Sequence, residues 1–297
     1  MTIDSTRRAF LLGLAAMAAP GAQAADTPAS PALSTATARI AALESQNGGR
    51  LGVAVIDTGS SARLLYRADE RFPMLSTFKL LASAAVLAKV DAGRERLDRI
   101  VPYSQSDLVG YGPVTKQRLA EGAMPLGDLC AAAIDWSDNT AANLLLGAIG
   151  GPAGLTAYLR SLGDATTRLD RTEPTLNTAI PGDERDTTTP MAMAETMQKL
   201  LLGNALSPTS RQQLSTWLID DKVGDARIRA GLPKTWRIGD KTGTGANATA
   251  NTVAILWPPD RAPILATVYH TGASGTMDAR MAVHKAIGAL IVETFTG

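Results

Sequence analysis

The sequence predicts an α+β protein in which a mostly antiparallel sheet of five strands is covered by the terminal helices and carries an inserted all-α lobe. Two observations support this fold class. Strand-like segments occur only near the two ends of the chain, and the region between them is rich in alanine and leucine at helical spacing. A chain of 297 residues is also long enough to bury one large core or two closely packed ones.

The first predicted elements are a helix and a hairpin. Residues Thr37–Ser45 carry apolar side chains at helical spacing, and the strand-like segments Leu51–Val55 and Leu64–Tyr66 flank a turn at Asp57–Ser60. Helical patterns then follow one another along the chain, at Thr77–Ala92, Leu126–Ile134, Asn139–Ala148, Gly154–Leu162, Pro190–Leu202 and Ser207–Leu218.

Strand signals return near the end of the chain, at Trp236–Lys241, Thr252–Trp257 and Ile264–Tyr269, before an amphipathic helix at Met277–Phe295. The simplest closure puts all strands in one sheet, with the first and last helices on one face. We therefore expect an α/β lobe of residues 25–67 and 219–297 and an all-α lobe of residues 68–218, with a cleft between them.

Residues 1–24 are expected to be a signal peptide, with a short core helix as the weaker alternative. Thr6–Leu11 holds a twin-arginine pattern, an apolar run follows from Ala9 to Ala19, and Ala22–Ala24 is typical of a cleavage site. The apolar run is too short for a membrane anchor. We therefore expect Tat export to the periplasm, with cleavage near Ala24 and no membrane attachment of the mature protein.

The composition narrows the function classes. The chain has 29 basic and 28 acidic residues, and this balance argues against nucleic acid or an anionic membrane as a partner. Cys130 is the only cysteine, so no intramolecular disulfide is possible, and its apolar neighbours predict a buried helical position. His270 and His284 are the only histidines and are expected to be structural. No Cys/His cluster supports a metal site, and we expect a monomer without a cofactor.

Ser76 and Lys79 lie three residues apart at the start of a predicted helix, which places both on one face. A serine hydroxyl is a weak nucleophile until an adjacent base takes its proton, and a desolvated amine can do so. A helix N-terminus also offers N–H groups to a developing oxyanion. Taken alone, the pair also fits an ordinary exposed serine and lysine.

Ser137, Asp138 and Asn139 precede a predicted helix and suit its N-cap. Beyond capping, the serine hydroxyl can relay a proton, and the asparagine amide can hold a substrate or a lysine. Capping alone also explains the motif.

Glu173 and Asn177 lie four residues apart in a long irregular segment, residues 168–186. Together they can hold one water, because the carboxylate takes its proton while the amide orients it. Arg171 and Asp186 are placed to close this loop with an ion pair. A surface glutamate and asparagine is the plain alternative.

Lys241, Thr242, Gly243 and Thr244 end a predicted strand. Glycine lets a ligand approach the backbone closely, and a strand edge can hydrogen-bond an extended ligand. The lysine and the threonine hydroxyls suit a carboxylate. A glycine-rich hairpin end is the alternative, and the spacing is not that of a P-loop.

These motifs, in this order and behind an export signal, resemble those of the class A serine β-lactamases, which have the penicillin-recognising fold. The resemblance covers essentially the whole mature chain. Tyr111, Asn143 and the Arg171/Asp186 pair match it as well. It implies a small-molecule β-lactam substrate, hydrolysis of penicillins and cephalosporins, and resistance to them.

The resemblance also implies roles for individual residues. Ser76 is acylated, and either Lys79 or Glu173 is the acylation base. Ser137 passes a proton to the departing lactam nitrogen, while Glu173 with Asn177 activates the deacylating water. Backbone N–H groups of Ser76 and Thr244 form the oxyanion hole. Substrate-binding roles are implied for Tyr111, Asn139, Asn177, Arg227, Lys241, Thr242, Gly243 and Thr244. The Glu173–Pro174 bond is expected to be cis.

Two departures from the family pattern affect specificity. Many members carry an arginine on the strand after the Lys-Thr-Gly strand, where this chain has Ala250, and Arg227 is expected to replace it. Leu75 stands where a carbapenem-hydrolysing subgroup has a disulfide-forming cysteine. With the hydroxyl of Thr244, this predicts a broad penicillinase–cephalosporinase without strong carbapenem hydrolysis.

Two rival functions share part of the motif set. A penicillin-binding D,D-peptidase has the serine-lysine, serine-asparagine and Lys-Thr-Gly elements, and a non-catalytic β-lactam sensor or cell-wall binding module stays acylated. Both are expected to lack the deacylating glutamate. Glu173 and Asn177 therefore discriminate between a hydrolase and these alternatives.

Overall fold

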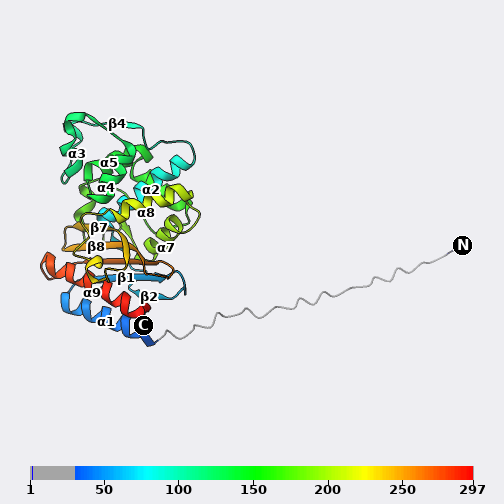
Figure 1. Cartoon of the computed structure of the whole chain (residues 1–297), viewed down its shortest axis with the longest axis vertical. Helices are drawn as coiled ribbons and strands as arrows, with labels where there is room; N and C mark the ends of the chain where they lie inside the picture. Colours follow the sequence, from blue (N-terminus) through cyan, green and yellow to red (C-terminus); the bar gives the residue numbers. More distant parts are fainter. Residues whose placement is uncertain (1, 3–30, 297) are drawn as a thin grey trace.

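The computed structural model describes residue 2 and residues 31–296 (Figure 1). The predicted signal peptide, residues 1–24, lies outside the described residues except for Thr2.

One five-stranded sheet organises the protein, in the order β2-β1-β9-β8-β7. Every neighbouring pair is antiparallel, so the predicted fold class is confirmed. The β1–β2 hairpin is the one predicted at the start of the chain. The strands are β1 (Arg50–Asp57), β2 (Arg63–Tyr66), β7 (Arg237–Gly245), β8 (Thr249–Trp257) and β9 (Ile264–Thr271).

The first and last helices cover one face of the sheet, as predicted (Figure 1). Ile40 of α1 (Pro31–Asn47) and Ile287 of α9 (Met277–Thr296) belong to one buried cluster with Val53 and Val268 of the sheet. Alternate residues of the same strands point to the opposite face, because side chains alternate along a strand. This alternation lets a single sheet support two layers of helices.

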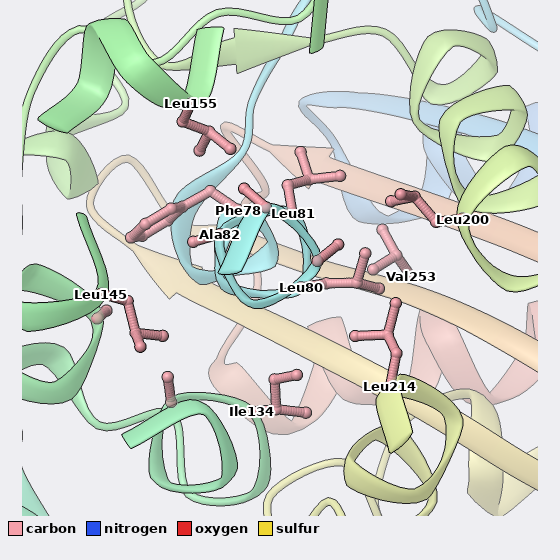
Figure 2. Packing of buried hydrophobic residues seen from close by; sticks show 14 of the residues in the cluster. Phe78, Leu80, Leu81, Ala82, Ile134, Leu145, Leu155, Leu200, Leu214 and Val253 are labelled. Atoms are coloured by element: carbon pink, nitrogen blue, oxygen red, sulfur yellow. The ribbon is translucent and has the colours of Figure 1, made fainter. Parts of the chain in front are cut away.

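Helix α2 (Phe78–Asp91) lies at the centre of the helices on the opposite face, and its residues from Phe78 to Leu87 are all buried. In Figure 2 the α2 side chains Phe78, Leu80, Leu81 and Ala82 are surrounded by apolar side chains of neighbouring helices and by Val253 of β8. A helix that is apolar all round is held on every side, which fixes the position of its N-terminus. The surrounding helices are α4 (Leu126–Asp135), α5 (Asn139–Ile149), α6 (Gly151–Ser161), α7 (Pro190–Leu201) and α8 (Pro208–Ile219).

The remaining elements are short, and the sequence analysis did not predict them. Two-stranded ladders join β3 to β6 and β4 to β5. These elements are β3 (Phe72–Pro73), β4 (Ile100–Pro102), β5 (Ala123–Pro125), β6 (Thr187–Thr188), α3 (Pro113–Gln117), and the 3₁₀ turns η1 (Leu75–Thr77), η2 (Gln105–Asp107), η3 (Leu119–Glu121), η4 (Thr175–Thr178) and η5 (Ile228–Gly231).

The side chains expected to be structural are buried. Cys130 lies inside α4, as predicted. His284 is within hydrogen-bonding distance of Thr252 Oγ1 and of the Ala250 carbonyl, at 2.9 and 3.1 Å. Within the described residues, no single helix meets the length and hydropathy of a membrane span, and only the bent pair α5–α6 does so jointly.

Candidate active site

A cavity of about 350 Å³ is lined by residues from both ends and the middle of the chain. It brings together most of the predicted site residues, although they lie far apart in sequence. Lys79, Glu173, Lys241 and Gly243 lie behind this lining. The lining residues are Ser76, Tyr111, Ser137, Asn139, Asn177, Val223, Arg227, Thr242, Thr244 and Met281. A larger cavity of about 590 Å³, bounded by Ala179–Glu184 and Arg50, contains none of the predicted site residues.

Ser76 lies in η1, and α2 begins two residues later, at Phe78. The Nζ of Lys79 donates to Ser76 Oγ at 3.0 Å, to the Ser137 carbonyl at 2.9 Å and to Asn139 Oδ1 at 2.7 Å. The lysine side chain is fully buried, and this burial lowers its pKa although the neighbouring Glu173 opposes the shift. The serine therefore faces an amine that is more easily neutralised than an exposed lysine.

Glu173 stands on the other side of the same lysine. Its Oε1 is 3.0 Å from Lys79 Nζ and accepts from Ser76 Oγ at 3.4 Å, and Asn177 Nδ2 donates to its Oε2 at 2.5 Å. Asn143 fixes its backbone through a pair of hydrogen bonds of 2.9 Å each, to the Glu173 carbonyl and from its N–H. The Glu173–Pro174 bond is cis, as predicted.

The loop that carries Glu173 is closed by an ion pair whose carboxylate is buried. Arg171 Nε lies 2.5 Å from Asp186 Oδ2, so the predicted pair is present. Asp186 Oδ1 also accepts from the backbone N–H groups of Asp170 and Arg171, at 2.8 and 2.9 Å. The carboxylate thus holds both ends of the loop.

The Ser137–Asn139 segment forms a second wall. Ser137 has a left-handed backbone, with a φ of 58°, and its Oγ accepts from Lys241 Nζ at 3.0 Å. Asp138 caps α5 by accepting from Ala141 N at 2.9 Å, so the capping interpretation is also correct. The Asn139 N–H donates to the Tyr111 carbonyl at 2.8 Å, which positions the half-exposed tyrosine at the rim.

Strand β7 carries Lys241 to Thr244 along one edge of the sheet. Gly243 also allows β7 to pack closely against η1. A Cβ there would lie 3.1 Å from both the Met74 carbonyl and Leu75 Cβ, so its absence lets η1 pack closely against the strand. This contact holds the residue before Ser76, Leu75, whose φ is 51°.

Arg227 is buried beside the end of β7. Its Nη1 donates to the Gly243 carbonyl at 3.0 Å and to the Asn251 carbonyl at 2.5 Å, and its Nη2 donates to Thr244 Oγ1 at 2.6 Å. Burial lowers its pKa to about 10, so the guanidinium is still charged at neutral pH. Ala250 pairs directly with Thr244, which confirms that the neighbouring strand offers no arginine at this register.

One supporting residue was missed by the sequence analysis. Asn251, buried in β8, donates through Nδ2 to the Pro73 and Met74 carbonyls at 2.8 and 3.1 Å. It thereby ties the segment before Ser76 to the sheet. Asp138, which the sequence analysis expected as an N-cap, also accepts from the Val114 and Thr115 N–H groups, at 3.1 and 2.9 Å. The only sequence signal for Asn251 was an amide side chain in a strand whose other residues are apolar or threonine.

Within the described part of the chain, no group of three or more histidine, cysteine or acidic side chains is arranged to hold a metal ion. The two histidines lie in the structural contacts of the sheet and α9 rather than in the cavity lining.

Comparison with known proteins identifies the family. A model of the beta-lactamase enzyme family matches residues 35–295. The chain belongs to the class A serine β-lactamases. It is 50% identical over 257 residues to Beta-lactamase CTX-M-97 of Escherichia coli, which covers 86% of this chain and 88% of that protein. It is 50% identical over 251 residues to Beta-lactamase OXY-2 of Klebsiella oxytoca, with 84% and 86% covered.

Solved structures agree. The ancestral (GNCA) class A β-lactamase is 60% identical, with a TM-score of 0.86, and the match covers 88% of this chain and 100% of that chain. The putative class A β-lactamase PenP from Rhodopseudomonas palustris is 54% identical, with a TM-score of 0.86 and the same coverage. This class A β-lactamase is therefore a hydrolase of β-lactams, an activity that confers resistance.

Proposed function

We propose that this β-lactamase hydrolyses penicillins and cephalosporins through an acyl-enzyme on Ser76, with Glu173 activating the deacylating water. One observation carries the proposal. A single buried amine, Lys79 Nζ, lies 3.0 Å from both Ser76 Oγ and Glu173 Oε1. Nucleophile, amine and carboxylate are thus in mutual reach in one site, as nucleophilic catalysis requires.

Acylation forms an ester between Ser76 Oγ and the lactam carbonyl carbon. The hydroxyl proton passes to either Lys79 or Glu173, because both are within reach of Ser76 Oγ. The N–H groups of Ser76 and Thr244 stabilise the oxyanion. Ser137 Oγ, held by Lys241 Nζ at 3.0 Å, gives a proton to the lactam nitrogen as the ring bond breaks.

Deacylation uses the Glu173 side of the site. The 3.4 Å separation between Ser76 Oγ and Glu173 Oε1 is longer than a typical O–H···O hydrogen bond. A water bound to Glu173 and Asn177 can therefore approach the ester of Ser76. Glu173 takes its proton, hydroxide attacks the carbonyl carbon, and Ser76 Oγ leaves with a proton.

The substrate is held on both sides of this chemistry. Its carboxylate is bound by Lys241, Thr242, Thr244 and Arg227, which converge at the end of β7. This binding is charge-assisted and therefore stronger than a neutral contact. The Asn139 amide, the β7 backbone at Gly243 and the Tyr111 ring bind the remainder of the substrate.

We further propose that the protein is exported by the Tat route, cleaved near Ala24, and works in the periplasm as a monomer without a cofactor. The sequence pattern of residues 1–24 supports this localisation. We also propose the division into an α/β lobe of residues 25–67 with 219–297 and an all-α lobe of residues 68–218, because helices α2 to α8 lie between β2 and β7 in the chain.

The decisive test is turnover of a chromogenic cephalosporin by the purified mature protein, with and without EDTA. We expect turnover to survive EDTA and to disappear in Ser76→Ala, while the exposed-site control Ser161→Ala behaves as wild type. Loss of activity on chelation, restored by zinc, would contradict the serine mechanism. A stoichiometric burst without turnover would instead indicate a peptidase-like or sensor-like protein.

A further inference from the structure

Two buried carboxyl groups lie near Lys241, and neither is among the residues that line the cavity. Asp221 follows α8, Asp240 precedes Lys241 in β7, and their exposures are 5% and 1%. Each has one oxygen with a partner, since Val223 N donates to Asp221 Oδ1 at 3.3 Å and Arg229 Nη2 to Asp240 Oδ1 at 2.7 Å. Within the described residues, neither Oδ2 atom has a conventional donor.

These two Oδ2 atoms face each other over Gly224. A Cβ on Gly224 would lie 2.1 Å from Asp240 Oδ2 and 2.4 Å from Asp221 Oδ2, so both oxygens occupy the space that a side chain would take. The two oxygens therefore lie no more than about 4.5 Å apart, and within the described residues neither has another partner. Two buried negative charges at this separation repel each other, which favours a proton on one of the two carboxyl groups.

The charge of this carboxyl pair affects the protonation of the nearby Lys241. Burial lowers the pKa of Lys241 to about 7; the negative charges of Asp221 and Asp240 oppose this shift, and the positive charges of Lys79 and Arg227 add to it. Three other charged groups lie nearby. Asp135 of α4 interacts electrostatically with Lys241, and Arg280 of α9 does so with Arg227. Arg229 forms an ion pair with Asp240.

Arg227 depends on the same pair. Burial lowers its pKa to about 10, and Asp240 and Asp221 again oppose the shift. For the pair itself, burial raises the pKa of Asp221 to about 7, with the charge of Asp240 acting in the same direction. Geometry and electrostatics therefore both favour one retained proton.

We propose that Asp221 and Asp240 share one proton and act as a single buried negative charge that keeps Lys241 and Arg227 charged for the substrate carboxylate. The inference rests on the role proposed above for those two cations. Asp221 and Asp240 are positioning residues, because neither lines the cavity. Gly224 is required because any side chain there would separate the two carboxyl groups.

The shared proton gives the pair an unusual response to substitution. In Asp221→Asn the amide donates to Asp240, so the pair keeps its hydrogen bond and its single negative charge. The alkaline limit of kcat/KM is then expected to stay in place. In Asp221→Asn/Asp240→Asn the negative charge is gone, and the limit is expected to fall by about one pH unit or more, mainly through KM.

Infrared spectroscopy provides a second readout that needs no substrate. At pH 6 the wild-type spectrum is expected to show protonated-carboxyl absorption, and one component of it is expected to be lost in Asp221→Asn. The rest includes Asp135, because burial raises the pKa of that carboxyl to about 7. The control Asp225→Asn, whose side chain is 83% exposed and also faces Arg229, is expected to keep both the full carboxyl absorption and the alkaline limit.

The outcomes separate this inference from the proposed function. Unchanged carboxyl absorption in Asp221→Asn, or a lowered alkaline limit in this single variant, would overturn the shared proton. If the double variant does not fold, the infrared comparison of the single variant still decides. If the wild-type protein failed to hydrolyse β-lactams, the infrared comparison would still test the pair, and only the proposed function would fall.

Discussion

Replacing Glu173 by glutamine removes the proposed base for deacylation while keeping the size of the side chain. The glutamate side chain is fully buried, and glutamine keeps an acceptor oxygen for one of its two donors, Lys79 Nζ and Asn177 Nδ2. What is lost is the ability to take a proton from water, a contribution of roughly 10²–10⁴-fold in rate. This corresponds to about 3–5 kcal/mol of activation free energy on the deacylation step.

Acylation is expected to slow less, because Lys79 also lies 3.0 Å from Ser76 Oγ. The variant should therefore react with benzylpenicillin and stall as an ester. Rapid mixing followed by quenching and intact-protein mass spectrometry gives both rates, and peptide mapping places the adduct on Ser76. The matched control is Glu184→Gln, an exposed glutamate of the same loop, which should turn over normally.

Two results would refute this reasoning. Normal turnover of Glu173→Gln would show that the carboxylate is not the base. Slow turnover without an accumulated adduct would show that Glu173 limits a step before the ester forms, and would assign it to acylation.

Three further predictions concern the anchor, the substrate range and the loop. Arg227→Ala should lower kcat/KM about 10–100-fold, because a charge-assisted hydrogen bond contributes roughly 1.5–3 kcal/mol; steady-state kinetics on benzylpenicillin check this, and an unchanged value would remove Arg227 from the anchor. Carbapenem turnover should be far slower than penicillin turnover, given Leu75, and equal rates would reject the specificity prediction. Asp186→Asn should lower the free energy of unfolding by about 1–3 kcal/mol, because the buried Asp186 carboxylate accepts from Arg171 Nε and from two backbone N–H groups. Urea unfolding measures this, and a neutral result would show that these contacts do not stabilise the fold.

The sequence predicted most of the long elements because each carries a full period of apolar residues. The hairpin, the three C-terminal strands and the closing helix are present within a few residues of their expected bounds. The two-stranded ladders β3–β6 and β4–β5 could not be predicted, because strands of two or three residues contain too little alternation. Their pairing depends on tertiary contacts between distant segments.

The site was predicted by resemblance rather than by spacing. No periodic pattern relates Ser76 to Glu173 or Lys241, and only the fold brings them together. The supporting residue Asn251 and the Asp221–Asp240 pair were missed because an isolated polar residue gives no indication of its partner. Gly224 illustrates the difficulty, since its role appears only when a missing Cβ is placed between two oxygens.

The pairing of β1 with β9 has a consequence for biosynthesis. The register joins Arg50 to Thr271 and Asp57 to Ile264, so the second strand from one edge of the sheet finds its partner almost at the end of the chain. Contacts of such high sequence separation make folding slow. During translation β1 and β2 emerge early, and the edge of β1 that pairs with β9 stays unpaired until β9 has been synthesised. The nascent protein therefore cannot complete its sheet on the ribosome before nearly all of its message has been read.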